Sequence, residues 1–406
     1  VLRQVYDLAR NVGMKEVFER AFRDMTSGDR FQKINEYTAP ILVFYGDEDV
    51  CSGVLRQFSE EITKALVKKG VAVHAGIAGQ LDYDDMEKTI YKAVLGFQAA
   101  AFKNVFFQSL SGKKLQFWLD NPVFNQDMIK AMPKDCTFLC QDGNYADFIR
   151  KYYGYEAVVL PPGGCGSEWE TLQERPYDIS FLGAYQLPFA GVFRHEEKEY
   201  YDHMITHSGE TFFFGMCEMQ KENGTYVSDE ESADRVRKMK HVCQYVINYY
   251  RDKVIRSIVE HGYKLHVYGN SWDAFPMQEM LVRHPEVKGG EALVEFSKAK
   301  IGLNVMSWHK NGLTERVLNI MRSGSVCLTD YSEAVAKNFN DGTDLVIFRL
   351  DETQRLPELI RELLQNDAWK MIGENGRAKA QKRHSWEVRA EEVLRILGET
   401  KKNKKI

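Results

Sequence analysis

The stretch that decides the fold is IGLNVMSWHKNGLTERVLNIMRSGSVCLTDYSE, residues 301–333. It begins with an apolar run typical of a buried strand, continues through a polar loop into a segment of helical periodicity, and reaches a second apolar run after Gly324. At about 100° per residue, the apolar stripe of the helix consists of Leu313, Val317, Ile320 and Met321. Strand, helix and strand in this order predict a parallel sheet covered by helices, which is an α/β architecture.

The same alternation extends through most of the chain. Further β-rich runs occupy 41–46, 71–77, 104–110, 115–121, 136–142, 157–163, 178–185, 264–270, 300–306, 326–331 and 345–349. Between them, residues 161–177 are rich in proline and glycine, the composition of a connector between two cores. We therefore predict two Rossmann-like α/β domains, residues 37–175 and 176–384, that face each other across a cleft. A helical preamble (1–36) precedes them, and a final helix that crosses back to the first domain, with a basic tail, follows them (385–406).

The composition of the 406 residues disfavours several classes of protein. With 54 basic and 58 acidic side chains the net charge is −4, so no positive field favours nucleic-acid binding. The apolar runs are shorter than the roughly 18 residues that span a membrane. Seven scattered cysteines indicate neither a disulfide framework nor a zinc site, and they predict a cytoplasmic protein. The lysines of the tail (401–405) would allow peripheral contact with anionic lipid.

The loop and first turn of the helix near residue 313 carry the residues best suited to hold an anion. Asn311 is a good N-cap and Gly312 allows close approach to the backbone, so free N–H groups and the positive end of the helix dipole would face a ligand. His309, Lys310 and Arg316 add further donors. Together these groups suit a nucleoside diphosphate, although periodicity alone favours an ordinary helix whose polar face is solvated.

Six segments of the second half carry a resemblance to a known family. They are YDISFLGAY (177–185), LHVYGNSW (265–272), KAKIGLNV (298–305), NGLTERVLNIMRSG (311–324), VCLTDYSE (326–333) and RHSWEVRAEEVL (383–394). In this order they resemble the CgeB-like glycosyltransferases, a group-1-type family with the two-Rossmann GT-B fold. The first half resembles the family's N-terminal domain only loosely, through LDNP (119–122) and the linker LPPG.

The resemblance implies that the second domain binds a nucleotide-sugar donor. In the family, a Glu three residues after the helix Arg is expected to bond the ribose of the donor. Here Arg316 is followed by Asn319, so either Glu315 has taken over this role or the choice of donor has changed. The resemblance also places five residues at the border of the donor pocket: Gly183, Tyr185, Tyr268, Gly269 and Asn304.

Two further sets of carboxylates are candidates for chemistry. Asp47 and Asp49 flank Glu48 directly after a β-rich run and would suit Mg²⁺ or Mn²⁺. We expect instead a loop without metal, from which Asp47 or Asp49 contacts the acceptor. Asp120 ends another β-rich run, so its carboxylate would reach the cleft and could deprotonate an acceptor.

The sequence therefore predicts a glycosyltransferase that needs neither metal nor cofactor. It would move a sugar from a UDP- or GDP-sugar to a glycan, protein or small-molecule acceptor, and the group-1 relatives imply retention of the anomeric configuration. His309, Lys310 and Arg316 would stabilise the departing diphosphate in place of a cation. Three alternatives stay open: a nucleotide-sugar epimerase or hydrolase of the same fold, a metal-dependent glycosyltransferase that uses Asp47 and Asp49, and a non-catalytic two-lobed sugar-binding protein.

Overall fold

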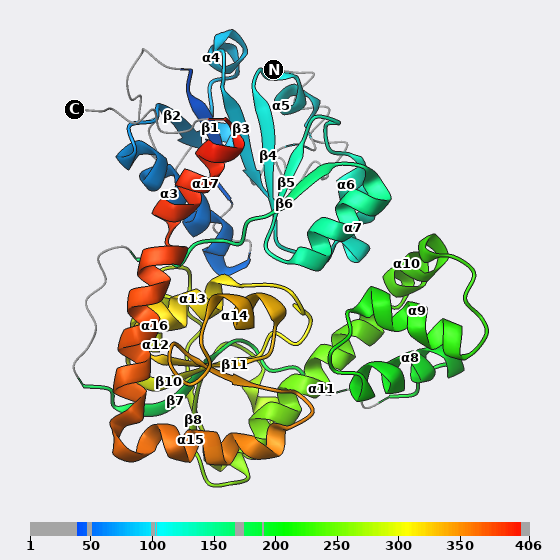
Figure 1. The fold of residues 1–406 in the computed structure, drawn as a ribbon, viewed down its shortest axis with the longest axis vertical. Helices are drawn as coiled ribbons and strands as arrows, with labels where there is room; N and C mark the ends of the chain where they lie inside the picture. The colour runs from blue at the N-terminus through cyan, green and yellow to red at the C-terminus, as the bar shows by residue number, and fades with distance from the viewer. Residues whose placement is uncertain are drawn as a thin grey trace.

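The structure is a computed structural model that describes residues 39–46, 51–98, 102, 104–166, 174–188 and 191–398. The expected helical preamble (1–36) and the basic tail (401–405) lie outside the described residues. Figure 1 shows two α/β bodies, one above the other, with a group of helices beside them.

The first domain is built on a parallel sheet of six strands in the order β2-β1-β3-β4-β5-β6. Its strands are β1 (Ile41–Phe44), β2 (Val73–Gly76), β3 (Ala93–Phe97), β4 (Lys113–Trp118), β5 (Thr137–Cys140) and β6 (Glu156–Val159). Its helices are α3 (Val54–Lys68), α4 (Tyr83–Lys88), α5 (Val105–Ser109), α6 (Gln126–Lys130) and α7 (Gly143–Tyr153). Every residue of β1 and β3 is buried, as expected of central parallel strands that are covered on both faces.

The second domain repeats this architecture with the strand order β12-β11-β10-β7-β8-β9. Its strands are β7 (Tyr177–Leu182), β8 (Leu265–Tyr268), β9 (Leu281–His284), β10 (Ala299–Asn304), β11 (Val326–Asp330) and β12 (Val346–Phe348). Helices of this domain are α12 (Glu291–Ser297), α13 (Glu315–Arg322), α14 (Glu333–Asn338), α15 (Leu356–Leu364) and α16 (Ala368–His384). Two all-parallel α/β sheets confirm the predicted fold class.

Short 3-10 turns lie in the connections of both domains. They are η1 (Cys51–Gly53), η2 (Ala78–Gln80), η4 (Pro122–Asn125), η5 (Trp272–Ala274), η6 (Gln278–Met280), η7 (Thr353–Arg355) and η8 (Gln365–Asp367).

Three elements differ from the sequence-based expectation. The run 104–110, expected as a strand, forms helix α5, because the side chain of Asn104 caps it by accepting a hydrogen bond from Phe106 N at 3.0 Å. Strand β3 was not predicted: its sequence AVLGF contains Ala and Gly, which disfavour strands when judged locally. Strand β9 was also missed: its sequence LVRH has only two apolar residues before a charged one, too short a run to indicate a strand locally.

A helical insertion joins β7 to β8. It contains α8 (His195–Thr206), α9 (Phe212–Glu222), α10 (Asp229–Lys238) and the long α11 (Lys240–Val259). In Figure 1, α8–α10 stand out from the second domain at one end of α11, on the same side as α7. The insertion reaches the first domain, because Lys151 Nζ and Tyr152 Oη donate to Asp229 Oδ2 at 2.8 and 2.6 Å.

The last helix, α17 (Trp386–Ile396), returns to the first domain. Trp386 is 1% exposed, and its ring lies 5.3 Å from the ring of Phe58 and 5.9 Å from that of Phe117, measured between centroids. The chain thus passes between the domains at the linker 160–176 and again before α17. None of the described helices combines the length and the apolar character that crossing a bilayer requires.

Candidate functional site

A pocket of about 290 Å³ lies between the two domains, where β7 and β8 end. We call it the β7–β8 pocket. Its lining comprises Leu182, Gly183 and Ala184 at the end of β7; Tyr268, Gly269 and Asn270 at the end of β8; Glu286, Val287, Gly289, Ala292 and Phe296; Glu315, Arg316 and Asn319 of α13; and Ser52, Val54 and Gln57 of the first domain. The carboxyl ends of parallel strands are where open α/β sheets bind ligands. The structure therefore brings together six of the residues singled out in the sequence: Gly183, Tyr268, Gly269, Glu315, Arg316 and Asn319.

Two glycines form the floor of this pocket. Gly269 has a φ of +129°, and a Cβ atom there would lie 2.8 Å from the carbonyl carbon of Gly183. Gly183 N donates to Tyr268 O at 2.8 Å, and Trp272 Nε1 donates to Gly183 O at 3.0 Å. The two strand-end loops are therefore packed backbone against backbone, which leaves room for a ligand above them.

Helix α13 supplies the polar wall of the pocket. Its apolar stripe is buried as predicted. Its polar side is divided: Glu315 and Arg316 line the pocket, whereas Asn319 Oδ1 accepts a hydrogen bond from Cys165 N in the linker at 2.9 Å. Arg322, on the same side, is 3% exposed and donates to Gly166 O. The linker therefore covers part of the polar face that was expected to meet a ligand or solvent.

Two guanidinium groups lie close to the Gly183 loop. Arg316 Nη1 is 3.8 Å from Met306 Sδ. A Cβ atom on Gly183 would lie 4.0 Å from the same nitrogen. Burial lowers the pKa of Arg316, although Glu315 opposes this effect. Arg251 of α11 donates Nη1 to Ala184 O at 2.9 Å, and burial, followed by the charge of Arg316, lowers its pKa to about 10. Within the described residues no carboxylate forms an ion pair with either arginine, so their positive charges would favour an anion in the pocket that Arg316 lines.

The first domain closes one side of the pocket through Ser52. Ser52 Oγ donates to Glu286 Oε1 at 2.8 Å, and Gly289 N donates to Ser52 O at 3.1 Å. Asn270 Nδ2 donates to the other oxygen of Glu286 at 2.9 Å. The pocket is thus completed only when the two domains are in contact.

The turn His309–Gly312 contradicts the sequence-based expectation for phosphate binding. Helix α13 begins at Glu315 and its N-cap is Thr314, so the prediction that Asn311 caps it is wrong. Amides that were expected to face a ligand are bound to the first domain instead: Asn311 N donates to Asp142 Oδ2 at 3.2 Å, and Leu313 N, directly after the turn, donates to Gln141 O at 3.2 Å. A Cβ on Gly312 would lie 2.9 Å from Asp142 Oδ2. The close approach that requires Gly312 is therefore to the first domain.

His309 belongs to the same contact between domains. It is 5% exposed, and the Gln141 amide nitrogen, which can only donate, lies 3.4 Å from its Nε2. This places the ring proton on Nδ1, 3.7 Å from Asp142 Oδ2. Lys310 donates to Ser208 O and lines a different pocket, and burial lowers its pKa to about 8. Neither side chain lines the β7–β8 pocket, contrary to expectation.

Two other expected pocket residues lie in the protein interior. Tyr185 is fully buried, donates its hydroxyl to Asp252 Oδ1 at 2.6 Å and stacks on Trp272. Asn304 is 1% exposed and donates to Thr329 Oγ1 at 2.9 Å, beside a cavity of about 10 Å³. Tyr185 follows β7 and Asn304 ends β10, but neither side chain lines the β7–β8 pocket.

Of the candidate carboxylates, Asp120 is exposed at the end of β4. It accepts a hydrogen bond from Gln98 Nε2 at 2.9 Å. Partial desolvation by the surrounding protein raises the pKa of the Asp120 carboxyl, and the charges of His309 and Lys240 oppose this increase. Asp120 thus lies near the contact between the domains. Asp47 and Asp49 lie outside the described residues.

Sequence reasoning missed several residues of this site. Asn270 is the last residue of the predicted β-rich run 264–270, so its position gave a usable signal. Arg251, Ser52 and Glu286 gave none, because they reach the site from elements that lie far from it along the chain.

The chain matches a family model over residues 251–395, from α11 to α17, and that model is described as glycosyl transferase-like. No curated protein sequence matches the chain. By its matched domain the chain is an enzyme of the glycosyltransferase class.

Solved structures agree in fold. Sucrose-phosphate synthase from Thermosynechococcus elongatus is similar, with a TM-score of 0.54 and 10% identity over 88% of this chain and 98% of that one. A DNA-modifying beta-glucosyltransferase has a TM-score of 0.53 and 13% identity over 89% and 100%. T4 phage BGT, described in complex with its UDP-glucose substrate, has a TM-score of 0.51 and 10% identity over 88% and 98%. The two domains therefore form the GT-B fold.

Proposed function

We propose that this chain transfers a sugar from a nucleotide-sugar donor, held in the β7–β8 pocket, to an acceptor that approaches from the first domain. One observation carries the proposal: Arg316 lines the pocket, the guanidinium of Arg251 bonds the neighbouring Ala184 O, and no ion pair with a described carboxylate neutralises either group. The diphosphate of a donor would supply the missing negative charge.

The rest of the pocket suits the remaining parts of a nucleotide. Leu182, Val287 and Phe296 offer apolar surface for a base. Glu315 can accept a hydrogen bond from a ribose hydroxyl. Asn319 has its oxygen occupied by Cys165 N, which leaves its amide N–H groups as donors. The UDP-glucose of T4 phage BGT makes UDP the first nucleotide to test.

The chemistry follows from where charge develops. When the bond between the sugar and the phosphate breaks, negative charge grows on the departing diphosphate. Arg316 would stabilise it without a metal ion, an interaction typically worth about 3–4 kcal/mol in the transition state. Asp120 is the proposed base, since its raised pKa increases its affinity for the acceptor proton.

The proposal has three finer parts. The order of the six segments from 177 to 394 supports a CgeB-like glycosyltransferase. That resemblance also favours retention, which the anomeric configuration of the product, read by NMR, would decide. Six cysteines are free, namely Cys136, Cys140, Cys165, Cys217, Cys243 and Cys327, which supports a reducing, cytoplasmic environment.

The first experiment needs no acceptor. Thermal unfolding is measured with UDP, GDP, UDP-sugars and GDP-sugars, each with and without EDTA. We expect at least one nucleoside diphosphate to raise Tm equally under both conditions. A shift that EDTA abolishes would favour a metal-dependent enzyme that uses Asp47 and Asp49, and no shift with any nucleotide would contradict the donor site.

The second experiment assigns the diphosphate to Arg316. Arg316→Ala should weaken UDP binding about tenfold or more, because a hydrogen bond to a charged group is lost, and leave uridine binding unchanged. Calorimetry measures both ligands, and Arg355→Ala, on the exposed surface, is the matched control. Equal losses for UDP and uridine would mean that Arg316 does not contact the diphosphate.

A further inference from the structure

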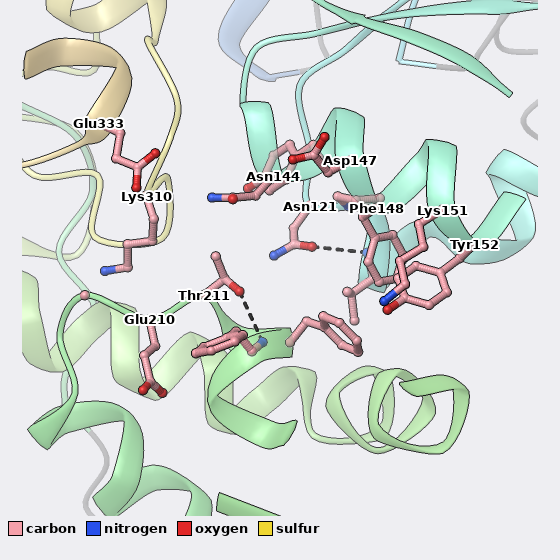
Figure 2. Close-up of a pocket in the computed structure, with 16 residues that line it drawn as sticks. Asn121, Asn144, Asp147, Phe148, Lys151, Tyr152, Glu210, Thr211, Lys310 and Glu333 are labelled. Carbon is pink, nitrogen blue, oxygen red and sulfur yellow. Dashed lines mark hydrogen bonds between the residues drawn. The ribbon is translucent and has the colours of Figure 1, made fainter. Parts of the chain in front are cut away.

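A second pocket, of about 390 Å³, lies between the first domain and the helical insertion. We call it the α7–α9 pocket. Figure 2 shows that α7 forms one wall and the start of α9 the other, with Lys310 and Glu333 of the second domain at one end. Three separate parts of the chain therefore build this pocket, and the sugar-transfer chemistry proposed above uses none of its residues.

The aromatic side of the pocket is rigid but accessible. The ring of Phe213 meets those of Phe148 and Tyr152 edge-on, at centroid distances of 5.3 and 5.6 Å. This packing fixes the start of α9 against α7. The next residue, Phe214, is 51% exposed and lines the pocket. An exposed ring on a fixed support offers an apolar face to a ligand.

The polar side offers hydrogen-bonding groups with spare capacity. Asn121 uses its oxygen to accept from Val123 N at 3.1 Å, so its two amide N–H groups are left for a ligand. The Asn144 side chain has no hydrogen bond to any described residue. Lys310 donates to Ser208 O and keeps further N–H donors. In Figure 2 the amide groups of Asn121 and Asn144 point into the same open space, whereas Lys310 lies on its far side with its ammonium directed away from them.

The charges of the pocket are largely paired within the protein. Lys151 pairs with Asp229 at 2.8 Å, and Asp147 pairs with Arg150. Glu210 contacts His203 at 2.8 Å. The ammonium of Lys310 and the carboxylate of Glu333 add one charge of each sign. The lining thus carries three carboxylates and two ammonium groups, several of them paired within the protein. This mixture of signs disfavours a strongly charged ligand and favours a neutral ligand rich in hydroxyl groups.

We infer that the α7–α9 pocket binds an uncharged glycan, and that this glycan is the acceptor. An exposed ring, primary amides and groups of both signs match the apolar faces and the hydroxyl groups of neutral sugar rings. Only the second clause rests on the proposed function. The helical insertion then acts as the part of the second domain that recognises the acceptor.

A glycan array of neutral, acidic and phosphorylated glycans, probed with the full labelled chain, tests the inference. We expect binding to at least one uncharged glycan, weakened at least tenfold by Phe214→Ala and by Asn144→Ala. Val227→Ala is the matched control, because Val227 is 69% exposed on the same insertion and does not line the pocket. Thermal unfolding of each variant checks the fold.

The inference is overturned if no glycan binds, if only charged glycans bind, or if both pocket variants bind as the wild type does. UDP calorimetry on the same proteins separates this result from the donor proposal. Phe214→Ala should bind UDP normally and Arg316→Ala should bind the glycan normally. A wild-type protein that binds the glycan but not UDP would reject the donor site alone.

Discussion

Gly269 shows how one residue sets the shape of the proposed donor site. Its φ of +129° is strained for any other residue, and a Cβ there would meet the Gly183 backbone at 2.8 Å. Gly269→Ala should therefore lower stability by more than the roughly 1–3 kcal/mol of backbone strain alone and abolish the thermal shift given by nucleotides.

Gly262→Ala is the control for this prediction. Gly262 also has a positive φ, +88°, but nothing lies within 4 Å of where its Cβ would be. Its substitution should cost only about 1–2 kcal/mol of conformational strain and leave nucleotide binding intact. Equal unfolding free energies for the two variants in urea would show that the contact with Gly183 does not matter.

At this scale the sequence predicted part of the site. Arg316 was found as a cationic donor in the first turn of the helix, and Glu315 through the family resemblance, as the residue that could replace the missing Glu at position 319. Asn311 and Gly312 were misassigned, because the sequence does not show that Asp142, far away along the chain, binds their turn. Arg251 gave no signal, since its role depends on the tertiary contact with Ala184.

Among the elements, the junction of α16 and α17 predicts a dependence of stability on pH. His384 is 6% exposed, and burial, together with the charge of Arg389, lowers its pKa to about 3. The unfolded chain has a pKa near 6.5 at this group, so the folded state favours the neutral form. The resulting stability is complete above about pH 6.5 and is lost as the pH falls towards 3, by about 1.4 kcal/mol per pH unit.

Urea unfolding at pH 7.5 and pH 5.0 measures this effect. We expect a loss of about 2 kcal/mol from His384, and His266, whose pKa is lowered to about 4 mainly by burial, adds to it. His384→Asn keeps an acceptor for Arg389 Nη2, which lies 3.1 Å from His384 Nδ1, but cannot be protonated. An unchanged pH dependence in this variant would contradict the assignment.

The elements themselves were predicted where the local pattern was strong. Runs of β-branched and aromatic residues identified most strands of both sheets, whereas β3 becomes a strand because β1 and β4 flank it. The amphipathic pattern of α13 was recognised, but the pattern does not reveal whether solvent, a ligand or the linker covers the polar side. That distinction depends on Asn319 and Arg322 meeting residues 165 and 166.

For the whole molecule, Asp142 is the group that most directly joins the two domains. It is fully buried, caps α7 by accepting from Asn144 N at 2.8 Å, and accepts from Asn311 N of the second domain. Asp142→Ala should lower Tm and increase the radius of gyration measured by small-angle X-ray scattering, because an unpaired buried amide favours separation of the domains.

Asp82→Ala is the control for Asp142→Ala. Asp82 caps α4 through Asp84 N and Asp85 N, and these are the only hydrogen bonds that its carboxylate forms with the described residues. Its loss should cost about 0.5–2 kcal/mol, like the loss of any cap, without a change in the radius of gyration. An unchanged radius in Asp142→Ala would show that other contacts suffice to hold the domains together.

The central claim is that the β7–β8 pocket holds the diphosphate of a nucleotide sugar. A crystal structure of the chain with the nucleoside diphosphate that gives the largest thermal shift tests it most directly. We predict phosphate oxygens within hydrogen-bonding distance of the Arg316 guanidinium, with the ribose beside Glu315. A nucleotide bound elsewhere, for example in the α7–α9 pocket, or with its phosphates directed away from Arg316, would contradict the claim.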